Sequence, residues 1–337
     1  MAQVSKSNTS VESATLGHHL PAIRLAVLIP CYNEELTIAD VVHQFQAALP
    51  EADIYVFDNN SSDRTVDEAQ AAGARVFFER RQGKGYVVQS MFRKVDADIY
   101  VMVDGDGTYP AQVVETLIAP IRRGEADMVI GSRLHHAATS KFRALNRWGN
   151  KFFLLVLNVV FGVQLTDLLS GYRAFSRRLV RGVPLFSGGF ETEAELTIKA
   201  LQRGFPIVEV PVNLGHRPVG SHSKIRLVQD GFVILSTILT LLRDYKPLTF
   251  FGGLGLGLIA LGFVPGAVVI TEFITTGLVL RLPSAILALG LVLTGVIAIV
   301  VGLILHTIAR HFQELDFQLQ TFTDGLHSPH EAERETR

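Results

Sequence analysis

Two long apolar runs near the C-terminus constrain this chain more than any other feature. Leu248 to Ile270 contains no charged residue, and Leu282 to Leu305 is a second uncharged run of similar length. As a helix rising 1.5 Å per residue, each run covers the roughly 30 Å of a bilayer core. A hairpin buried in a soluble core is the alternative, but soluble helices of this length usually carry a polar stripe. The sequence therefore predicts a two-helix transmembrane hairpin over residues 248–306.

Composition excludes several other classes of protein. The 337 residues are 48% hydrophobic and 19% charged, which is too apolar for a disordered chain. The formal net charge of −1 argues against a strongly basic nucleic-acid binder, so no nucleic-acid partner is expected. The single cysteine, Cys31, excludes an intrachain disulfide framework and a cysteine-rich zinc module.

The segments that flank the runs predict the topology. Residues 1–22 are polar and lack the apolar core of a signal peptide, which predicts a disordered tail and a domain that stays in the cytoplasm. Arg243 and Lys246 precede the first run, and basic residues favour the cytoplasmic side. Two spans return residues 307–337 to that side as a cytoplasmic tail.

Two further apolar stretches are too short to cross a membrane. Residues 223–247 combine apolar and basic residues, and we expect them to form an interfacial amphipathic segment. Phe152 to Phe161 is apolar apart from Asn158, and its sequence fits a membrane surface and a protein core equally well.

The catalytic domain is expected over residues 23–222, where short apolar runs alternate with helix-like segments. This rhythm predicts an α/β fold with a mainly parallel, Rossmann-like sheet covered by helices. Ser61 or Ser62 is expected to cap the second helix. The predicted strands are Leu25–Ile29, Ile54–Phe57, Arg75–Phe78, Ile99–Val103 and Met128–Ile130. The predicted helices are Glu35–Ala48, Asp63–Ala72, Lys84–Val95 and Pro110–Arg122.

Polar clusters follow three of these strands. Each cluster alone fits a turn, but all three should meet at the carboxyl edge of the sheet, where ligands bind. The clusters are Pro30-Cys-Tyr32-Asn-Glu34-Glu35, Asp58-Asn-Asn60-Ser-Ser-Asp63 and Asp104-Gly-Asp106-Gly107.

The third cluster carries the ligands for a divalent metal. Asp104 and Asp106 supply the hard oxygens that Mg²⁺ or Mn²⁺ prefers. In an extended segment they would point to opposite faces, so that one binds metal directly and the other acts through water or holds a sugar hydroxyl. An EF-hand is excluded because Thr108 stands at its fifth loop position.

Basic residues complete the candidate site. Lys84 lies between Gly83 and Gly85 at an expected helix start, which favours an anionic group, but the full P-loop pattern is absent. Arg143 and Arg147 precede the apolar stretch at Phe152, where they suit either a lipid phosphate or a solvated basic face.

Seven motifs together resemble the inverting family 2 glycosyltransferases of the GT-A fold, and within them the polyprenyl-phosphate glycosyltransferases. The resemblance covers about residues 24–228, and the two spans resemble the bacterial glucosyl and aminoarabinosyl branch. The motifs are Pro30-Cys-Tyr-Asn-Glu34, Asp58 with Asn60-Ser-Ser-Asp63, Gly83-Lys-Gly85, Asp104-Gly-Asp106, Gly131-Ser-Arg133, Ser170-Gly-Tyr-Arg-Ala-Phe175 and the Arg217 to Lys224 loop.

Site residues follow from the resemblance position by position. Asp104 and Asp106 would hold the metal, diphosphate and sugar, and Glu191 or Glu193 would face the sugar or support the site. The acceptor phosphate would lie against Arg133, Arg147 and the neighbouring Arg143. The nucleotide-sugar would lie against Pro30, Tyr32, Glu34, Asp58, Asn60, Lys84, Arg217 and Lys224.

The resemblance implies an enzyme that transfers one sugar from a UDP- or GDP-sugar to a polyprenyl phosphate, with Mg²⁺ or Mn²⁺. It implies an integral protein of the bacterial inner membrane and a homo-oligomer such as a tetramer. A processive polysaccharide synthase is a competing hypothesis, but Ala144 replaces the Gln of its Gln-x-x-Arg-Trp signature before Arg147-Trp148. The other competing hypothesis is a membrane-anchored protein that binds a nucleotide-sugar without catalysing a reaction.

Overall fold

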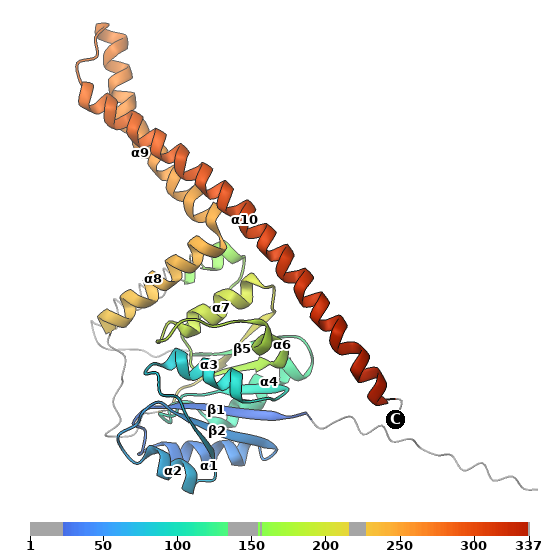
Figure 1. Ribbon diagram of the computed structural model, residues 1–337. Helices are drawn as coiled ribbons and strands as arrows, with labels where there is room; N and C mark the ends of the chain where they lie inside the picture. Colours follow the sequence, from blue (N-terminus) through green and yellow to red (C-terminus); the bar gives the residue numbers. More distant parts are fainter. Residues whose placement is uncertain (1–22, 134–153, 156, 216–226, 336–337) are drawn as a thin grey trace, which may run out of the picture.

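The computed structural model describes residues 23–133, 154–155, 157–215 and 227–335 (Figure 1). The tail over residues 1–22 lies outside the described residues. The same is true of four predicted site residues: Arg143, Arg147, Arg217 and Lys224. The described chain forms an α/β domain that is followed by a long helical hairpin.

A seven-stranded sheet forms the centre of the domain, in the order β3-β2-β1-β4-β6-β5-β7. Neighbouring strands pair in parallel except at β6, which is antiparallel to both β4 and β5. The strands are β1 (Leu25–Cys31), β2 (Ala52–Asp58), β3 (Arg75–Phe78), β4 (Ile99–Met102), β5 (Met128–Arg133), β6 (Arg173–Ser176) and β7 (Ile207–Val212). The mainly parallel α/β fold is confirmed.

Helices cover both faces of the sheet, and each face has its own apolar core. One core lies under α1 (Ile38–Ala48), α2 (Thr65–Ala71), η1 (Ala111–Val113) and α4 (Val114–Arg122). The other lies under α3 (Lys84–Lys94), α6 (Arg177–Gly182), α7 (Thr192–Gln202) and α8 (Leu227–Tyr245). Alternate residues of β1, such as Val27 and Leu28, supply opposite cores, as the two-residue period of a strand requires.

One local prediction about the second helix is wrong. Helix α2 begins at Thr65, too far along the chain for Ser61 or Ser62 to cap it. Instead, the Asp63 carboxylate accepts hydrogen bonds from the Thr65 amide at 3.0 Å and from its hydroxyl at 2.5 Å. The serine side chain of Ser61 is used elsewhere, because it accepts a hydrogen bond from the Asn33 amide.

Helix α8 joins the domain to the hairpin. Its residues Ile238, Leu241 and Leu242 are buried in the core beside α7, whereas Val233 and Leu239 are exposed. At the end of α8, the Lys246 ammonium lies 5.1 Å from the centre of the Phe161 ring. The segment near residue 160 therefore packs against the start of the hairpin.

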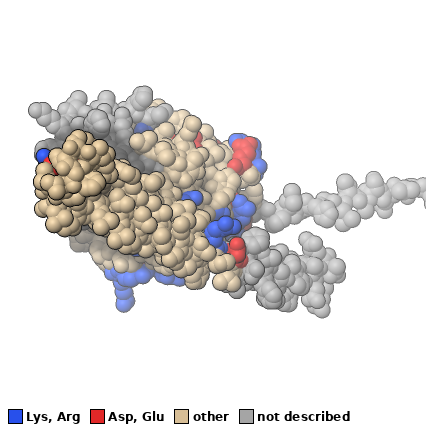
Figure 2. Space-filling model, turned by 90° about the horizontal axis from the view of Figure 1, so that it is seen from above, with Lys and Arg blue, Asp and Glu red and all other residues tan. Residues whose placement is uncertain are grey.

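The two apolar runs form helices α9 (Pro247–Thr276) and α10 (Leu282–Glu335), which project together from the domain (Figure 1). Both are long and apolar enough to cross a membrane, and only 17% of each apolar window is buried. A core helix of a soluble protein would be mostly buried, so the exposed apolar side chains of α9 and α10 favour a lipid environment. Seen from the hairpin end, the surface is mostly uncharged, with Lys and Arg in a few patches (Figure 2).

Small residues form the contact between α9 and α10. A Cβ atom added to Gly255 would lie 2.5 Å from the carbonyl oxygen of Gly295, and one added to Gly295 would lie 2.6 Å from that of Gly255. The backbones therefore touch at this point, as small residues allow in membrane helices. By contrast, Gly253 and Gly257 have nothing within 4 Å of such an atom.

This contact predicts a stability difference between two glycines of the same helix. Gly255→Leu should push α9 and α10 apart and cost about 1–3 kcal/mol, as overpacking does. Gly257→Leu is the control, because its side chain would enter open space. Thermal unfolding of the detergent-solubilised protein measures both, and equal melting temperatures would contradict the described packing.

Candidate active site

The loops after β1 and β2 are tied to each other by side chains. Asn33 accepts a hydrogen bond from the Ser62 amide at 2.8 Å, and the Glu34 amide donates to the Thr65 hydroxyl at 2.8 Å. Asn33 and Asn60 have φ values of 53° and 63°, in the left-handed region that asparagine tolerates better than most residues. The first two polar clusters thus meet at the carboxyl edge of the sheet.

Asp58 is the most deeply buried acid of these clusters, with 3% of its surface exposed. One carboxylate oxygen accepts from the Ser61 amide at 3.2 Å, while Oδ1 is buried and has no hydrogen-bond partner among the described residues. A buried carboxylate oxygen without a donor is unfavourable. On the paired strand β1, Cys31 lies opposite Asp58 and Pro30 opposite Phe57, and the exposed Tyr32 follows Cys31. This corner could therefore accept a donor group from a ligand.

The third cluster is a turn, so the expectation of an extended segment is wrong. Gly107 has a φ of 72°, and the Asp106 carboxylate accepts from the Thr108 amide at 3.0 Å and hydroxyl at 2.6 Å. Thr37, at the start of α1, donates to the Gly105 carbonyl at 2.7 Å and fixes the turn against the first cluster. Asp104 and Asp106 are therefore brought to the same edge as Asp58.

Lys84 bridges two carboxylates that are distant in sequence. Its ammonium lies 2.6 Å from Asp104 Oδ1 and 2.6 Å from Glu193 Oε1. Burial alone would lower the pKa of Lys84, but the two carboxylates outweigh it and raise that pKa above its usual value. The lysine thus stays charged, and the anions that it binds in this structure belong to the protein.

The glycine beside Lys84 is required by a close backbone contact. The Gly85 amide donates to the Gly188 carbonyl at 3.0 Å, and a Cβ on Gly85 would lie 2.1 Å from the Ser187 carbonyl oxygen. The Ser187 segment is held in turn by a buried ion pair on α7, Glu195 with Lys199, at 2.6 Å. Glu195 accepts from the Ser187 amide at 2.8 Å.

The two predicted acids near the start of α7 have different surroundings. Glu193 has 4% of its side chain exposed and contacts the Lys84 ammonium, so it is a buried support for that lysine. Glu191 precedes the helix and accepts a hydrogen bond from the nearby Gly189 amide at 3.0 Å. The structure brings Glu193 to Lys84, which also contacts Asp104.

Arg133, at the end of β5, is held by Asp167. Its Nε lies 2.6 Å from one carboxylate oxygen and its Nη2 lies 2.7 Å from the other, while 34% of the side chain stays exposed. Burial alone would lower the pKa of Arg133, but Asp167 raises it above the ordinary value. The result is a permanently charged, oriented guanidinium at the carboxyl edge.

Sequence reasoning missed three of the residues that build this site. Asp167 and the Glu195–Lys199 pair lie in segments without a recognisable motif, and only their contacts reveal them. Arg173 lies in the Ser170-Gly-Tyr-Arg motif, but it is fully buried and donates to the carbonyls of Ser170 and Leu168. Its role is to fix this segment, whose Gly171 touches Asp104.

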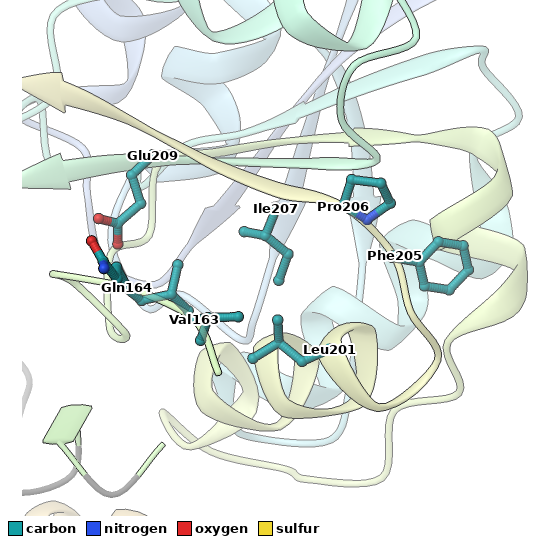
Figure 3. A pocket seen from close by; sticks show the side chains of 8 residues that line it. Val163, Gln164, Leu201, Phe205, Pro206, Ile207 and Glu209 are labelled. Carbon is teal, nitrogen blue, oxygen red and sulfur yellow. The ribbon is translucent and has the colours of Figure 1, made fainter. Parts of the chain in front are cut away.

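A cavity of about 310 Å³ lies near the start of β7 (Figure 3). It contains none of the predicted site residues. Glu209 at its rim accepts from the amides of Thr166 and Asp167, so its carboxylate is engaged in holding the partner of Arg133. The lining is Val163, Gln164, Leu165, Leu201, Phe205, Pro206, Ile207 and Glu209.

The donor set of the site fits a metal that is shared with a phosphorylated ligand. The described residues include no group of three or more His, Cys, Asp or Glu side chains placed to hold a metal. Two nearby carboxylates, Asp104 and Asp106, match the way Mg²⁺ is held by one or two carboxylates together with substrate phosphates.

The sheet topology and the carboxyl edge that carries Asp58, Asp104 and Asp106, which we call the acidic edge, identify the domain as the GT-A fold of glycosyltransferases. Residues 26–183 match the family model described as glycosyl transferase family 2. The glycosyltransferase AglJ of Haloferax volcanii is 34% identical over 239 residues, which are 71% of this chain and 78% of that protein. The chain belongs to glycosyl transferase family 2.

Other relatives include a sugar transferase that is named for a polyprenyl-phosphate acceptor. The dolichyl-phosphate hexose transferase of Haloferax volcanii is 32% identical over 56% of this chain and 81% of its own. Among solved structures, glucosyl-3-phosphoglycerate synthase of Mycobacterium tuberculosis, in complex with Mn²⁺, UDP and glucosyl-3-phosphoglycerate, matches with a TM-score of 0.56. That match has 26% identity and covers 65% of this chain and 80% of the other. The protein is thus a glycosyltransferase with polyprenyl-phosphate sugar transferases among its homologues.

The contacts of Lys84 with two carboxylates predict that Lys84 and Glu193 are coupled in their effect on the free energy of unfolding. Lys84→Met leaves Asp104 and Glu193 close together without a cation and should cost about 3 kcal/mol, as removal of one partner of a buried pair does. Adding Glu193→Gln should recover part of this loss, because it removes one of the two stranded charges. Denaturant unfolding of the wild type, both single variants and the double variant gives the coupling energy, and strict additivity would contradict the bridge.

Proposed function

We propose that this protein transfers a single sugar from a UDP- or GDP-linked donor to a polyprenyl phosphate, with inversion at the anomeric carbon. The observation that carries the proposal is the position of the acidic edge in a chain that also holds a membrane hairpin. In Figure 1 the carboxyl ends of the strands and the start of α8 lie on the same side of the domain. A water-soluble donor and a membrane-embedded acceptor could both reach this side.

The donor is assigned to the clusters after β1, β2 and β4. Asp58, whose buried Oδ1 has no donor within the part of the chain that the structure describes, would accept a hydrogen bond from the base. Pro30, Tyr32, Glu34 and Asn60 would surround base and ribose. Arg217 and Lys224 would reach the diphosphate, as the family resemblance implies. Lys84 would act through Asp104, whose carboxylate it holds in place.

Asp104 and Asp106 would hold Mg²⁺ or Mn²⁺, in line with the manganese in the related glucosyl-3-phosphoglycerate synthase complex. A divalent ion bound there would stabilise the charge on the departing nucleotide diphosphate. Asp104 and Asp106 would also orient the sugar, and Glu193 would keep Lys84 and therefore Asp104 in position.

The acceptor is assigned to Arg133, Arg143 and Arg147. A phosphate monoester has a second pKa of about 6, so the lipid phosphate is largely dianionic at neutral pH and needs no strong general base. Its oxygen forms a bond to the anomeric carbon as the bond to the nucleotide diphosphate breaks and that group leaves with the electron pair. Asp167 orients the Arg133 guanidinium, so the protein contributes alignment and charge stabilisation.

The membrane arrangement follows the same proposal. Residues 248–306 would cross the inner membrane of a bacterium, and the catalytic domain, the interfacial segment 223–247 and residues 307–337 would lie on the cytoplasmic side. The positively charged Arg243 and Lys246 beside the first span support this orientation. The protein would act as a homo-oligomer.

One experiment separates this function from its competitors. The purified chain is incubated with undecaprenyl phosphate and each of a panel of UDP- and GDP-sugars, and both nucleotide release and lipid products are measured. We expect release with one donor only when the lipid phosphate is present, and one sugar per lipid. A polymeric product would indicate a processive synthase, and donor binding without release would indicate a non-catalytic protein.

The acidic pair gives a sharper prediction. Asp106→Asn should lower transfer by on the order of 100-fold or more, because the charge that faces the donor is lost. The asparagine oxygen can still accept from the Thr108 amide, so the fold should stay intact. Asp98→Asn, in an exposed ion pair at the other end of β4, is the matched control and should keep full activity.

Metal dependence is tested on the wild-type enzyme. A chelator should abolish transfer, and added Mg²⁺ or Mn²⁺ should restore it, because Asp104 and Asp106 need a cation to bind the diphosphate. Calorimetry with UDP and GDP should show the same dependence for nucleotide binding. Full activity in the chelator would exclude the metal role of the pair.

A further inference from the structure

The last part of helix α10 carries an apolar repeat that the membrane hairpin does not explain. The apolar residues recur with spacings of three and four: Leu305, Ile308, Phe312, Leu315, Leu319, Phe322 and Leu326. These are the a and d positions of three successive heptads, the pattern of a coiled coil. We call this stripe the α10 seam.

The α10 seam does not continue the contact with α9. The α9-facing side of α10 contains Gly295, Ile299 and Gly302. At 3.6 residues per turn, the seam is rotated from that side by about a third of a turn. A Cβ on Gly302 would lie 3.4 Å from the carbonyl oxygen of Pro247, so α9 begins level with Gly302, ahead of the first seam residue.

Most of this seam lies beyond the second candidate span, which ends at Phe312. Arg310 and Glu314 mark where α10 leaves the apolar span. Phe312 is 68% exposed and Leu315 is 54% exposed in the single chain, which is unfavourable for such large apolar side chains in water. The sequence then places Leu319, Phe322 and Leu326 at the following register positions.

The geometry of the helix limits what can cover the seam. Helix α10 is unbroken from Leu282 to Glu335, so its distal part follows the axis of the span and cannot lie flat on the bilayer surface. Figure 1 shows this part passing beside the catalytic domain as a separate rod. A second helix that runs parallel to α10 can cover such a stripe along its whole length.

We propose that the α10 seam forms a parallel, in-register coiled coil with the α10 helix of a second copy of this chain. Two copies in one membrane have the same orientation and leave it at the same depth, which fixes both direction and register. Their shared membrane also raises the effective concentration that a coil of three heptads needs. This inference rests on the homo-oligomer proposed above, and it assigns the α10 seam as the surface through which two copies associate.

The residues that flank the seam allow this pairing. Flanking positions in parallel coils set the choice of partner through their charges. The flanking positions are Ala309, His311, Asp316, Gln318, Thr323 and Gly325. Among them, only Asp316 is acidic and only His311 is basic. His311 of one copy and Asp316 of the other occupy complementary positions, so like charges do not oppose the pairing.

The single cysteine of the chain makes a direct test possible. Cys31 is buried, so a cysteine placed on α10 is the reactive one. In a parallel, in-register coil, Leu319→Cys of two copies face each other within the Cα distance that a disulfide spans, whereas Gln320→Cys points outward. Membranes with the full-length variants are oxidised with copper phenanthroline and run on a non-reducing gel.

We expect most of Leu319→Cys, and at most a trace of Gln320→Cys, to run as a covalent dimer. A Leu319→Cys thiol that reacts with maleimide but forms no dimer would overturn the proposal, and so would equal dimer formation at both positions or a disulfide to another protein. The test needs no substrate and can be repeated in the Asp106→Asn background. Its failure is therefore distinct from failure of the proposed transfer reaction.

Discussion

The contact between Lys84 and its two carboxylates is the interaction on which the candidate site depends. It joins the start of α3, the turn after β4 and the first turn of α7, three segments that the sheet alone does not bring together. With the ammonium absent, Asp104 and Glu193 would repel each other across a poorly solvated space. The close contact of Gly85 with the 187–188 backbone, which Glu195 holds, packs the start of α3, where Lys84 lies, against this segment.

Much of the fold could be predicted because its signals are local. The strands β1 to β5 are short apolar runs bounded by turn residues, and a period-two or continuous apolar pattern needs no knowledge of the partner strand. Strands β6 and β7 were not predicted. Arg173, the first residue of β6, is a buried charge, and Pro211 interrupts β7, so both sequences resemble loops. Their pairing is set by β4 and β5.

The candidate site was predictable in its acids and not in its ion pairs. Asp58, Asp104 and Asp106 follow strands directly, so the topology alone places them at one edge. Glu193, one of the two partners of Lys84, lies about 110 residues away from it, and Asp167 lies 34 residues from Arg133, and no spacing rule connects these pairs. The apolar seam of α10 is a different case, since its repeat is visible in the sequence but begins where the uncharged run ends.

The unbroken course of α10 has a mechanical consequence. Between Gly302 and Gly325 the helix contains neither glycine nor proline, so this part crosses the proposed membrane boundary near residue 306 as a stiff rod. Membrane helices change tilt when bilayer thickness changes, and the part from residue 306 to Gly325 is roughly 30 Å long at 1.5 Å per residue. A tilt of about 10° would then move its far end sideways by roughly 5 Å. In the proposed membrane arrangement, the thickness of the bilayer would thus be converted into a displacement outside it.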